Sequence, residues 1–572
     1  MKGISLNNLG KSIDFLEIIN NYRWEFFKKD VSAGLTVAAA SFPQVMAFAL
    51  LLGLNPIYGL YTFIIATMAA TLTGRSSYMV VGPTNMVAVT VASGLSSFSV
   101  VNGENYLQFV LLLTFLVGII QIVMGSLNLG KLAHFISRPV IVGFTSGISI
   151  IIIASQLSRL LGLTVEKASL SVVHSLYQTV VNLNMVNYYA LGIGLFTIGF
   201  ILFCKKYAPH LPSYLLSLVG SLILVFVFHL GERLVLVNDF GNFSSSVPGF
   251  SVPQFSFSTL SSLFSMSFAI AILGFTQVSS ILRKMEKKTG EKVDLNKEFI
   301  SQGIINMVCS FFNSFVVTGS FSKSFMNLKA GAKSRLSELF AGFSVLLFIF
   351  LFGGVIGYIP VASLAGIIIL VAFYAIDRGQ IVKHLFTTKF DAAIFSTTFI
   401  ITILTPRLDY AIYFGVLVSF LLVLKTTSGI NYSHLSYDQN GDQQFAQEKY
   451  KNVKEDDYIV INLSGSLHFN TSQNLKEKLN KSFREDKIFV IRMRRVKDID
   501  VTAIQELEKF IDRVHQSGGE IIVCGLEKEI HKIMEQYGLI DKIDSENCFA
   551  VQDDIFKSTT KAIKQAENKA EK

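Results

Sequence analysis

The sequence has few of the residues that build metal sites, disulfide frameworks or catalytic centres. Its four cysteines, Cys204, Cys309, Cys524 and Cys548, are scattered along 572 residues, and none belongs to a Cys-x-x-Cys pair. This spacing predicts neither a disulfide framework nor a structural zinc site. The nine histidines form no ligand cluster. With no recognisable nucleophile or phosphate-binding loop either, we expect no metal, no cofactor and no enzymatic activity.

Charge is also scarce, because only 16% of the residues are Asp, Glu, Lys or Arg. Hydrophobic residues make up 51%, and the mean hydropathy is +0.49. These values are typical of a membrane protein with a soluble part. A formal charge of +9 would suggest nucleic acid as the partner of a soluble protein. Many of these basic residues lie in short loops between apolar segments, so we expect a lipid bilayer and no nucleic acid.

Apolar segments alternate with short loops from residue 31 to about residue 424. Most have the roughly 17–25 residues that a helix needs to cross a bilayer. The first thirty residues have no apolar run of the kind found in a cleavable signal peptide. We predict fourteen spans, near residues 31–54, 57–73, 83–99, 107–125, 138–158, 187–204, 212–230, 258–282, 298–313, 319–329, 336–356, 360–376, 390–405 and 408–425.

The charges of the loops predict the orientation of these spans. Most basic loop residues follow even-numbered spans, while the loops after odd-numbered spans contain only Arg159, Lys167, Arg233 and Arg407. The positive-inside rule therefore predicts a multi-pass protein of the cell membrane with both termini in the cytoplasm.

Two of the predicted spans begin with an interruption. A β-branched run ends at Gly82-Pro83-Thr84 in the third span, and a similar run ends at Gly319-Ser320 in the tenth. Each interruption lies two spans after a possible repeat start, at span 1 or span 8. Because seven spans is an odd number, the second repeat is expected to be inverted relative to the first. Inverted repeats with broken helices near the midplane are common in secondary transporters.

The two interruptions predict an anion site. Helix N-termini have unpaired N–H donors and partial positive charge, and Lys323 lies one turn into the tenth span. The hydroxyls of Thr84, Ser320 and Ser322 add neutral donors, and no carboxylate is expected beside them. The alternative is that Lys323 reaches water at the cytoplasmic end of its helix. Gln44, beside Pro43 in the first span, fits an interhelical hydrogen bond and a pocket donor equally well.

The composition changes after residue 424. Residues 428–456 are polar and predict a linker or the start of a second domain. Apolar strands then alternate with amphipathic helices, which is typical of a small α/β domain. We therefore divide the chain into an N-terminal cytoplasmic arm (1–30), a transmembrane domain (31–427), the segment 428–456, an α/β domain (457–565) and a charged tail (566–572).

Several motifs resemble those of the sulfate permease (SulP) family of anion transporters, over nearly the whole chain. They are residues 43–48 (PQVMAF), 53–61 (GLNPIYGLY), 81–83 (VGP), the loop 289–298, and 318–324 (TGSFSKS). The resemblance implies a uracil-transporter-like fold of seven plus seven inverted-repeat spans with core and gate domains, and a C-terminal STAS domain. It also implies an elevator-like mechanism, a homodimer, and a possible cytosolic protein partner of the STAS domain.

By position, the resemblance implies an anion site that includes Gln44, Phe48, Thr84, Ser320, Ser322 and Lys323. Lys323 stands where the family usually has arginine, so the charge is kept while the planar fork is lost. Gln277 occupies the position at which many members have a carboxylate associated with proton or sodium coupling. Glutamine does not titrate. We therefore expect secondary transport of a small anion by exchange or without coupling.

Other functions remain open from the sequence. A channel on the same scaffold and a proton- or sodium-coupled sulfate or bicarbonate symporter are the nearest alternatives. A membrane-anchored signalling scaffold acting through the STAS domain would not need Lys323. Nucleobase symport on a similar fold would require acidic residues in the pocket, and the expected pocket has none. The sequence does not distinguish sulfate, bicarbonate, chloride, nitrate and dicarboxylates.

Overall fold

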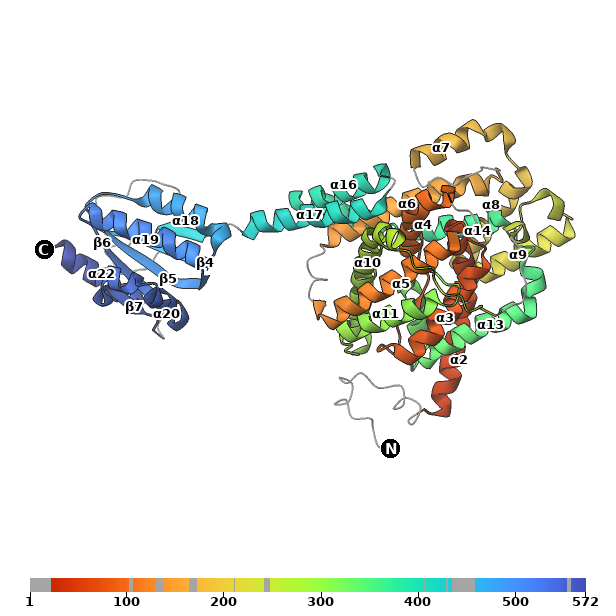
Figure 1. Cartoon of the computed structure of the whole chain (residues 1–572), viewed down its shortest axis with the longest axis horizontal. Coiled ribbons are helices and arrows are strands. Elements are labelled where there is room, and N and C mark those ends of the chain that lie inside the picture. Colours follow the sequence, from red (N-terminus) through yellow and green to blue (C-terminus); the bar gives the residue numbers. More distant parts are fainter. Residues whose placement is uncertain are drawn as a thin grey trace. The chain divides into compact units, whose positions relative to one another are not determined.

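The chain forms two units in a computed structural model, Met1–Ser419 and Phe420–Lys572 (Figure 1). The structure describes residues 22–101, 106–129, 137–163, 172–209, 211–240, 247–405, 407–427, 431–434, 458–552 and 557–571. Most of the predicted N-terminal arm, most of the segment 428–456, and Lys167 lie outside the described residues.

A helix lies at each of the fourteen predicted spans. The helices are α2 (Trp24–Leu51), α3 (Ile57–Thr73), α4 (Asn85–Val101), α5 (Tyr106–Ser126), α6 (Arg138–Leu160), α8 (Tyr188–Tyr207), α9 (Ser213–Val227), α10 (Phe257–Thr289), α11 (Leu295–Ser310), α12 (Phe321–Lys329), α13 (Leu336–Ile356), α14 (Val361–Ala375), α16 (Lys389–Leu404) and α17 (Leu408–Thr427). Within the described chain, seven helices are long and apolar enough to cross a membrane, and four shorter apolar helices accompany them. These helices confirm a polytopic helical membrane protein, while the number fourteen stays a prediction.

In the described part of residues 31–427, two helices occur where the sequence analysis expected none. They are α7 (Val172–Val181), between the fifth and sixth predicted spans, and α15 (Arg378–Phe386), between the twelfth and thirteenth. Both are too short to cross a bilayer. The side chain of Asp377 accepts a hydrogen bond from the Gln380 amide and so caps the start of α15.

The spanning helices pack in two groups. One contains α2–α5 and α10–α13, and the other contains α6, α8, α9, α14, α16 and α17. Glycine allows close contact within each group. A Cβ atom on Gly303 of α11 would lie 2.6 Å from the Gly118 carbonyl oxygen of α5, and one on Gly366 of α14 would lie 3.1 Å from the Gly194 oxygen of α8. Small residues at such contacts let membrane helices pack closely without hydrophobic driving force.

The second unit is an α/β domain, as predicted. Its five-stranded sheet has the order β3 (Asn431–His434), β4 (Tyr458–Leu467), β5 (Ile488–Ile499), β6 (Glu520–Leu526) and β7 (Cys548–Ala550). Strands β4 to β7 are parallel, and β3 pairs antiparallel with β4. The described part of the polar segment 428–456 thus contributes the strand β3.

Helices cover both faces of this sheet. Ile461, Ile491 and Val523 pack toward the side of α18 (Phe469–Ser482), α19 (Val501–Gln516), α20 (Lys528–Gln536) and α21 (Leu539–Ile543). Val460, Val490 and Ile522 pack against α22 (Lys557–Ala570) on the other face. The predicted charged tail at 566–572 is wrong as a separate segment, because Ala566 is buried and α22 continues to Ala570.

Candidate anion-binding site

The two interrupted spans meet in a short antiparallel pair of strands. Strand β1 (Val81–Gly82) pairs with β2 (Thr318–Gly319), with Val81 opposite Gly319. Helix α4 begins three residues after β1, and α12 begins two residues after β2. The pairing satisfies backbone groups that would otherwise be exposed inside the membrane. It also places the N-termini of two helices beside each other, as the inverted-repeat interpretation predicts.

Lys323 lies inside this arrangement and does not reach the surface. Its side chain is only 3% exposed, and its ammonium donates a hydrogen bond of 2.6 Å to the Pro83 carbonyl oxygen. The rings of Phe48 and Phe63 lie 5.8 and 6.0 Å from the ammonium, within the range of cation–π contact. The alternative that Lys323 simply reaches water is therefore wrong for this structure. Within the described chain, no carboxylate forms an ion pair with Lys323.

Neutral polar groups surround the strand pair. Thr84 and Ser320 are buried, and the Thr84 hydroxyl has no hydrogen-bond partner among the described residues. The Gln277 amide donates a hydrogen bond of 2.8 Å to the Gly319 carbonyl oxygen, while its own oxygen is without a partner in the described chain. Buried polar atoms without partners are rare in proteins and call for an explanation, of which a bound ligand or water is one.

The structure brings most of the predicted site residues together. Gln44 and Phe48 are buried on α2, which packs against α12 and α4. Ser322 differs, because its side chain is exposed while its neighbours Lys323 and Ser324 are buried. On a helix, successive residues point about 100° apart, so Ser322 and Lys323 face different directions. Ser322 is therefore not among the buried groups of the site in this structure.

Sequence reasoning missed three residues that shape the site. Phe63 of α3 lies beside Lys323, and the Ser324 hydroxyl accepts a hydrogen bond of 2.9 Å from the Val80 amide. The side chain of Asn306 in α11 accepts a hydrogen bond of 2.8 Å from the Val317 amide and donates one of 3.0 Å to the Val317 oxygen. An asparagine inside an apolar span was the available sequence signal for Asn306. No sequence signal distinguished Phe63 from the many other phenylalanines.

The site is thus cationic and rich in donors, with one ammonium, two helix N-termini and several neutral polar groups. A small anion matches this set of groups, because helix N-termini and buried cations both favour negative charge. No group of His, Cys, Asp and Glu in the described chain is arranged to hold a metal ion.

Comparison with known proteins identifies the family of the chain. The model of the sulfate permease family matches residues 27–398, and the model of the STAS domain matches residues 449–562. The chain belongs to the sulfate permease family. This membership confirms a multi-pass membrane transporter of anions with a STAS domain, and it confirms the prediction that the protein is not an enzyme.

Relatives of this sulfate permease family member cover almost its whole length. It is 28% identical over 537 residues to the putative sulfate transporter YvdB of Bacillus subtilis, covering 93% of this chain and 98% of that protein. It is 26% identical to the chloroplastic sulfate transporter 4.1 of Arabidopsis thaliana, covering 92% of this chain and 79% of that protein.

Solved structures show the same fold for this sulfate permease family member. The inward-facing structure of the murine anion transporter Slc26a9 superposes with a TM-score of 0.87 at 21% identity, over 97% of this chain and 94% of that one. The transmembrane domain of the cyanobacterial bicarbonate transporter BicA superposes with a TM-score of 0.61 at 25% identity, over 68% of this chain and 98% of that one.

Proposed function

We propose that this protein moves a small inorganic or carboxylate anion across the cell membrane by alternating access, as an exchanger or without coupling. The main support is the buried ammonium of Lys323 between the N-termini of α4 and α12. A cation at this depth is costly, and within the described chain no carboxylate forms an ion pair with it. A bound anion would neutralise the charge of Lys323 and so offset the free-energy cost of burying it.

The movement that we propose resembles an elevator. Helices α2–α5 and α10–α13 hold Gln44, Phe48, Thr84, Gln277, Ser320 and Lys323, so the proposed site lies within one packing group. That group would move against the other and expose the site on alternate sides of the membrane. Sulfate, bicarbonate, chloride and dicarboxylates are candidate substrates, since the relatives include proteins named for sulfate and bicarbonate.

Gln277 argues against proton or sodium coupling at this position. Its amide is held against the Gly319 oxygen, and a glutamine side chain offers no titratable group. The proposal further includes a homodimer with both termini in the cytoplasm and a cytosolic partner for the STAS domain. Size measurement in detergent tests the homodimer, and protease protection tests the location of the termini.

The test is uptake into liposomes by the purified full-length protein. Labelled sulfate, bicarbonate, chloride and succinate are offered in turn, with wild type beside Lys323→Ala. Loss of one charge-assisted contact weakens binding about 10- to 100-fold, so we expect uptake of the transported anion to fall by at least about tenfold. Lys329→Ala is the matched control, because Lys329 is an exposed lysine at the end of the same helix.

Two outcomes would contradict the proposal. If wild type took up none of the four anions above empty liposomes, anion transport of this class would be wrong. If Lys323→Ala transported as well as Lys329→Ala, transport would stand and the assigned site would be wrong. The transport rate separates a carrier from a channel, because a carrier moves its anions one conformational cycle at a time and a channel passes a current far above that rate.

A further inference from the structure

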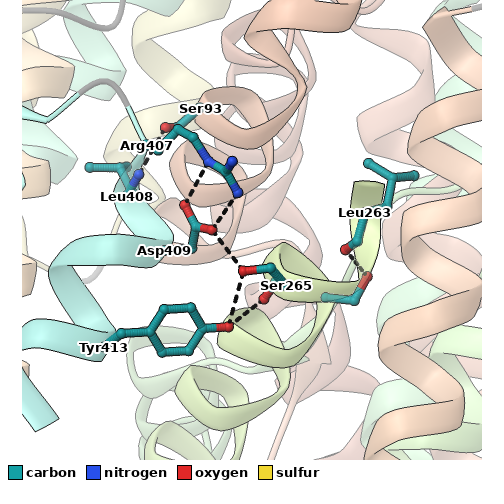
Figure 2. Close-up of polar contacts among 8 residues, drawn as sticks. Ser93, Leu263, Ser265, Arg407, Leu408, Asp409 and Tyr413 are labelled. Carbon is teal, nitrogen blue, oxygen red and sulfur yellow. Dashed lines mark hydrogen bonds and ion pairs between the residues drawn. The ribbon is translucent and has the colours of Figure 1, made fainter. Parts of the chain in front are cut away.

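A second polar cluster lies far from the anion site, at the start of α17. Asp409 is fully buried, and its carboxylate accepts hydrogen bonds from the Arg407 guanidinium at 2.7 and 3.3 Å and from the Ser265 hydroxyl at 3.0 Å (Figure 2). The Tyr413 hydroxyl donates a further hydrogen bond of 2.6 Å to the Ser265 carbonyl oxygen. We call Ser265, Arg407, Asp409 and Tyr413 the outer cluster.

The outer cluster joins the two helix groups. Helix α17 packs with α16 and α6, because a Cβ atom on Gly415 would lie 2.5 Å from the Thr398 hydroxyl and 3.0 Å from Val140. Ser265 belongs to α10, in the group that holds the anion site. A second bond crosses the same boundary, from the Leu408 amide to the Ser93 hydroxyl of α4 at 3.3 Å (Figure 2).

Helix α10 connects this cluster to the anion site. Twelve residues separate Ser265 from Gln277, which is about 18 Å along a helix. Gln277 in turn donates its hydrogen bond to the Gly319 oxygen of the strand pair. A displacement of the anion site relative to α17 along α10 therefore has to break the bonds that join Ser265 to Asp409 and Tyr413.

We propose that Ser265, Asp409 and Tyr413 are positioning residues that form a latch, which holds closed the end of the transport path remote from the basic loops. The proposal rests on the alternating-access function proposed above. The positive-inside rule assigns this end to the outside. Arg407 lies in the loop after the thirteenth predicted span, and Ser265 lies near the start of the eighth span, just after the loop that follows the seventh.

The composition of the outer cluster makes the latch releasable. Arg407 is on the same side of the boundary as Asp409, two residues away, and its side chain is 47% exposed. When Ser265 leaves, Asp409 keeps its guanidinium partner, so no buried charge is left unpaired. The released Ser265 hydroxyl is able to bond a carbonyl of its own helix, as Ser262 does with the Thr259 oxygen.

The test compares Ser265→Ala with Ser262→Ala in the full-length protein. Both remove one serine hydroxyl from α10, but the Ser262 hydroxyl bonds only within its helix among the described contacts. Ser265→Ala removes the bond to Asp409 and keeps the Tyr413 bond to the backbone oxygen of residue 265, so it weakens the latch and raises the population that is open to the outside. The half-saturating external sulfate or chloride concentration should then fall about 3- to 10-fold in Ser265→Ala, with Ser262→Ala like wild type. Tyr413→Phe should shift in the same direction.

A second measurement needs no transport. Thr84→Cys places a thiol at the anion site, and a membrane-impermeant maleimide is added to intact spheroplasts, with the protein lacking this cysteine as background. We expect Ser265→Ala to raise the labelling rate about 3- to 10-fold over Ser262→Ala. The latch would be overturned if the double variant Ser265→Ala/Tyr413→Phe, which lacks the Asp409 and Tyr413 bonds, showed the same labelling and half-saturation as Ser262→Ala. If wild type transports none of the anions offered, the proposed function fails, and the labelling comparison alone decides the latch.

Discussion

The Lys323 ammonium donates a hydrogen bond of 2.6 Å to the Pro83 carbonyl oxygen, across 240 residues of sequence. Proline cannot continue a helix from the residues before it, and α4 begins two residues after Pro83, at Asn85. The carbonyl of Pro83 is left beside the start of α12, where Lys323 reaches it. One bond thus connects the two interrupted spans at the position of the proposed anion site.

The role of Gln277 is tested by giving this position a carboxylate. In Gln277→Glu, an ionised side chain would face the Gly319 carbonyl oxygen and lie near the proposed anion position, whereas a protonated one still donates a hydrogen bond. We expect anion uptake to fall about tenfold at pH 8 and to recover as the pH is lowered to 5.5. The measurement is uptake against pH, with Gln277→Ala as control. A pH profile identical to that of Gln277→Ala would contradict the assigned position of Gln277.

Asn306 is expected to stabilise β2. In Asn306→Ala, the amide and carbonyl of Val317 and the oxygen of Gln121 each lose a hydrogen-bond partner. Buried polar groups left without partners cost about 1–3 kcal/mol, so the thermal midpoint in detergent should fall clearly and uptake should weaken. Ser267→Ala is the control, because the buried Ser267 hydroxyl bonds only its own helix at Leu263 among the described contacts. Equal midpoints for the two variants would show that Asn306 is dispensable.

Close packing of α5 and α11 is tested by one added methyl group. In Gly303→Ala, the new Cβ atom would lie 2.6 Å from the Gly118 oxygen, so the two backbones have to separate. Overpacking of this kind costs about 1–3 kcal/mol, and we expect a lower thermal midpoint in detergent. Gly199→Ala is the matched control, since nothing lies within 4 Å of its added Cβ atom. A loss of stability in Gly199→Ala as large as in Gly303→Ala would refute the packing argument.

Cys524 should be protected by the folded STAS domain. Burial raises the pKa of its thiol to about 11, with smaller opposing effects of Thr559 and Arg492. An unfolded thiol has a pKa of about 8.5, so the folded domain holds its proton more tightly. The stability linked to this group is complete below pH 8.5 and is lost as the pH rises through 11. Maleimide labelling followed by mass spectrometry should find Cys524 unmodified at pH 7.5 until denaturant is added. Labelling at the rate of a free thiol before unfolding would contradict its burial.

Much of the fold could be predicted from the sequence. The apolar segments coincide with helices because segment length and hydropathy decide membrane insertion locally. Strands β4, β5 and β6 were also predictable, since residues such as Val460 and Ile461 belong to apolar runs bounded by polar residues, whereas the short strand β7 was missed. Helices α7 and α15 were missed because neither is long enough to give a membrane-span signal. The tail at 566–572 was misassigned because the burial of Ala566 depends on a sheet that its own composition does not reveal.

The sequence by itself determined the family motifs, the two interruptions at Gly82-Pro83 and Gly319, and the lone cation at Lys323. These features are local, because glycine and proline act on their own backbone and a charge is costly wherever the membrane surrounds it. Only the tertiary structure decided that β1 pairs with β2, that Lys323 bonds Pro83 while Ser322 points away, and that Asp409 meets Ser265. Those contacts join residues far apart in the chain, and packing of the helices sets them.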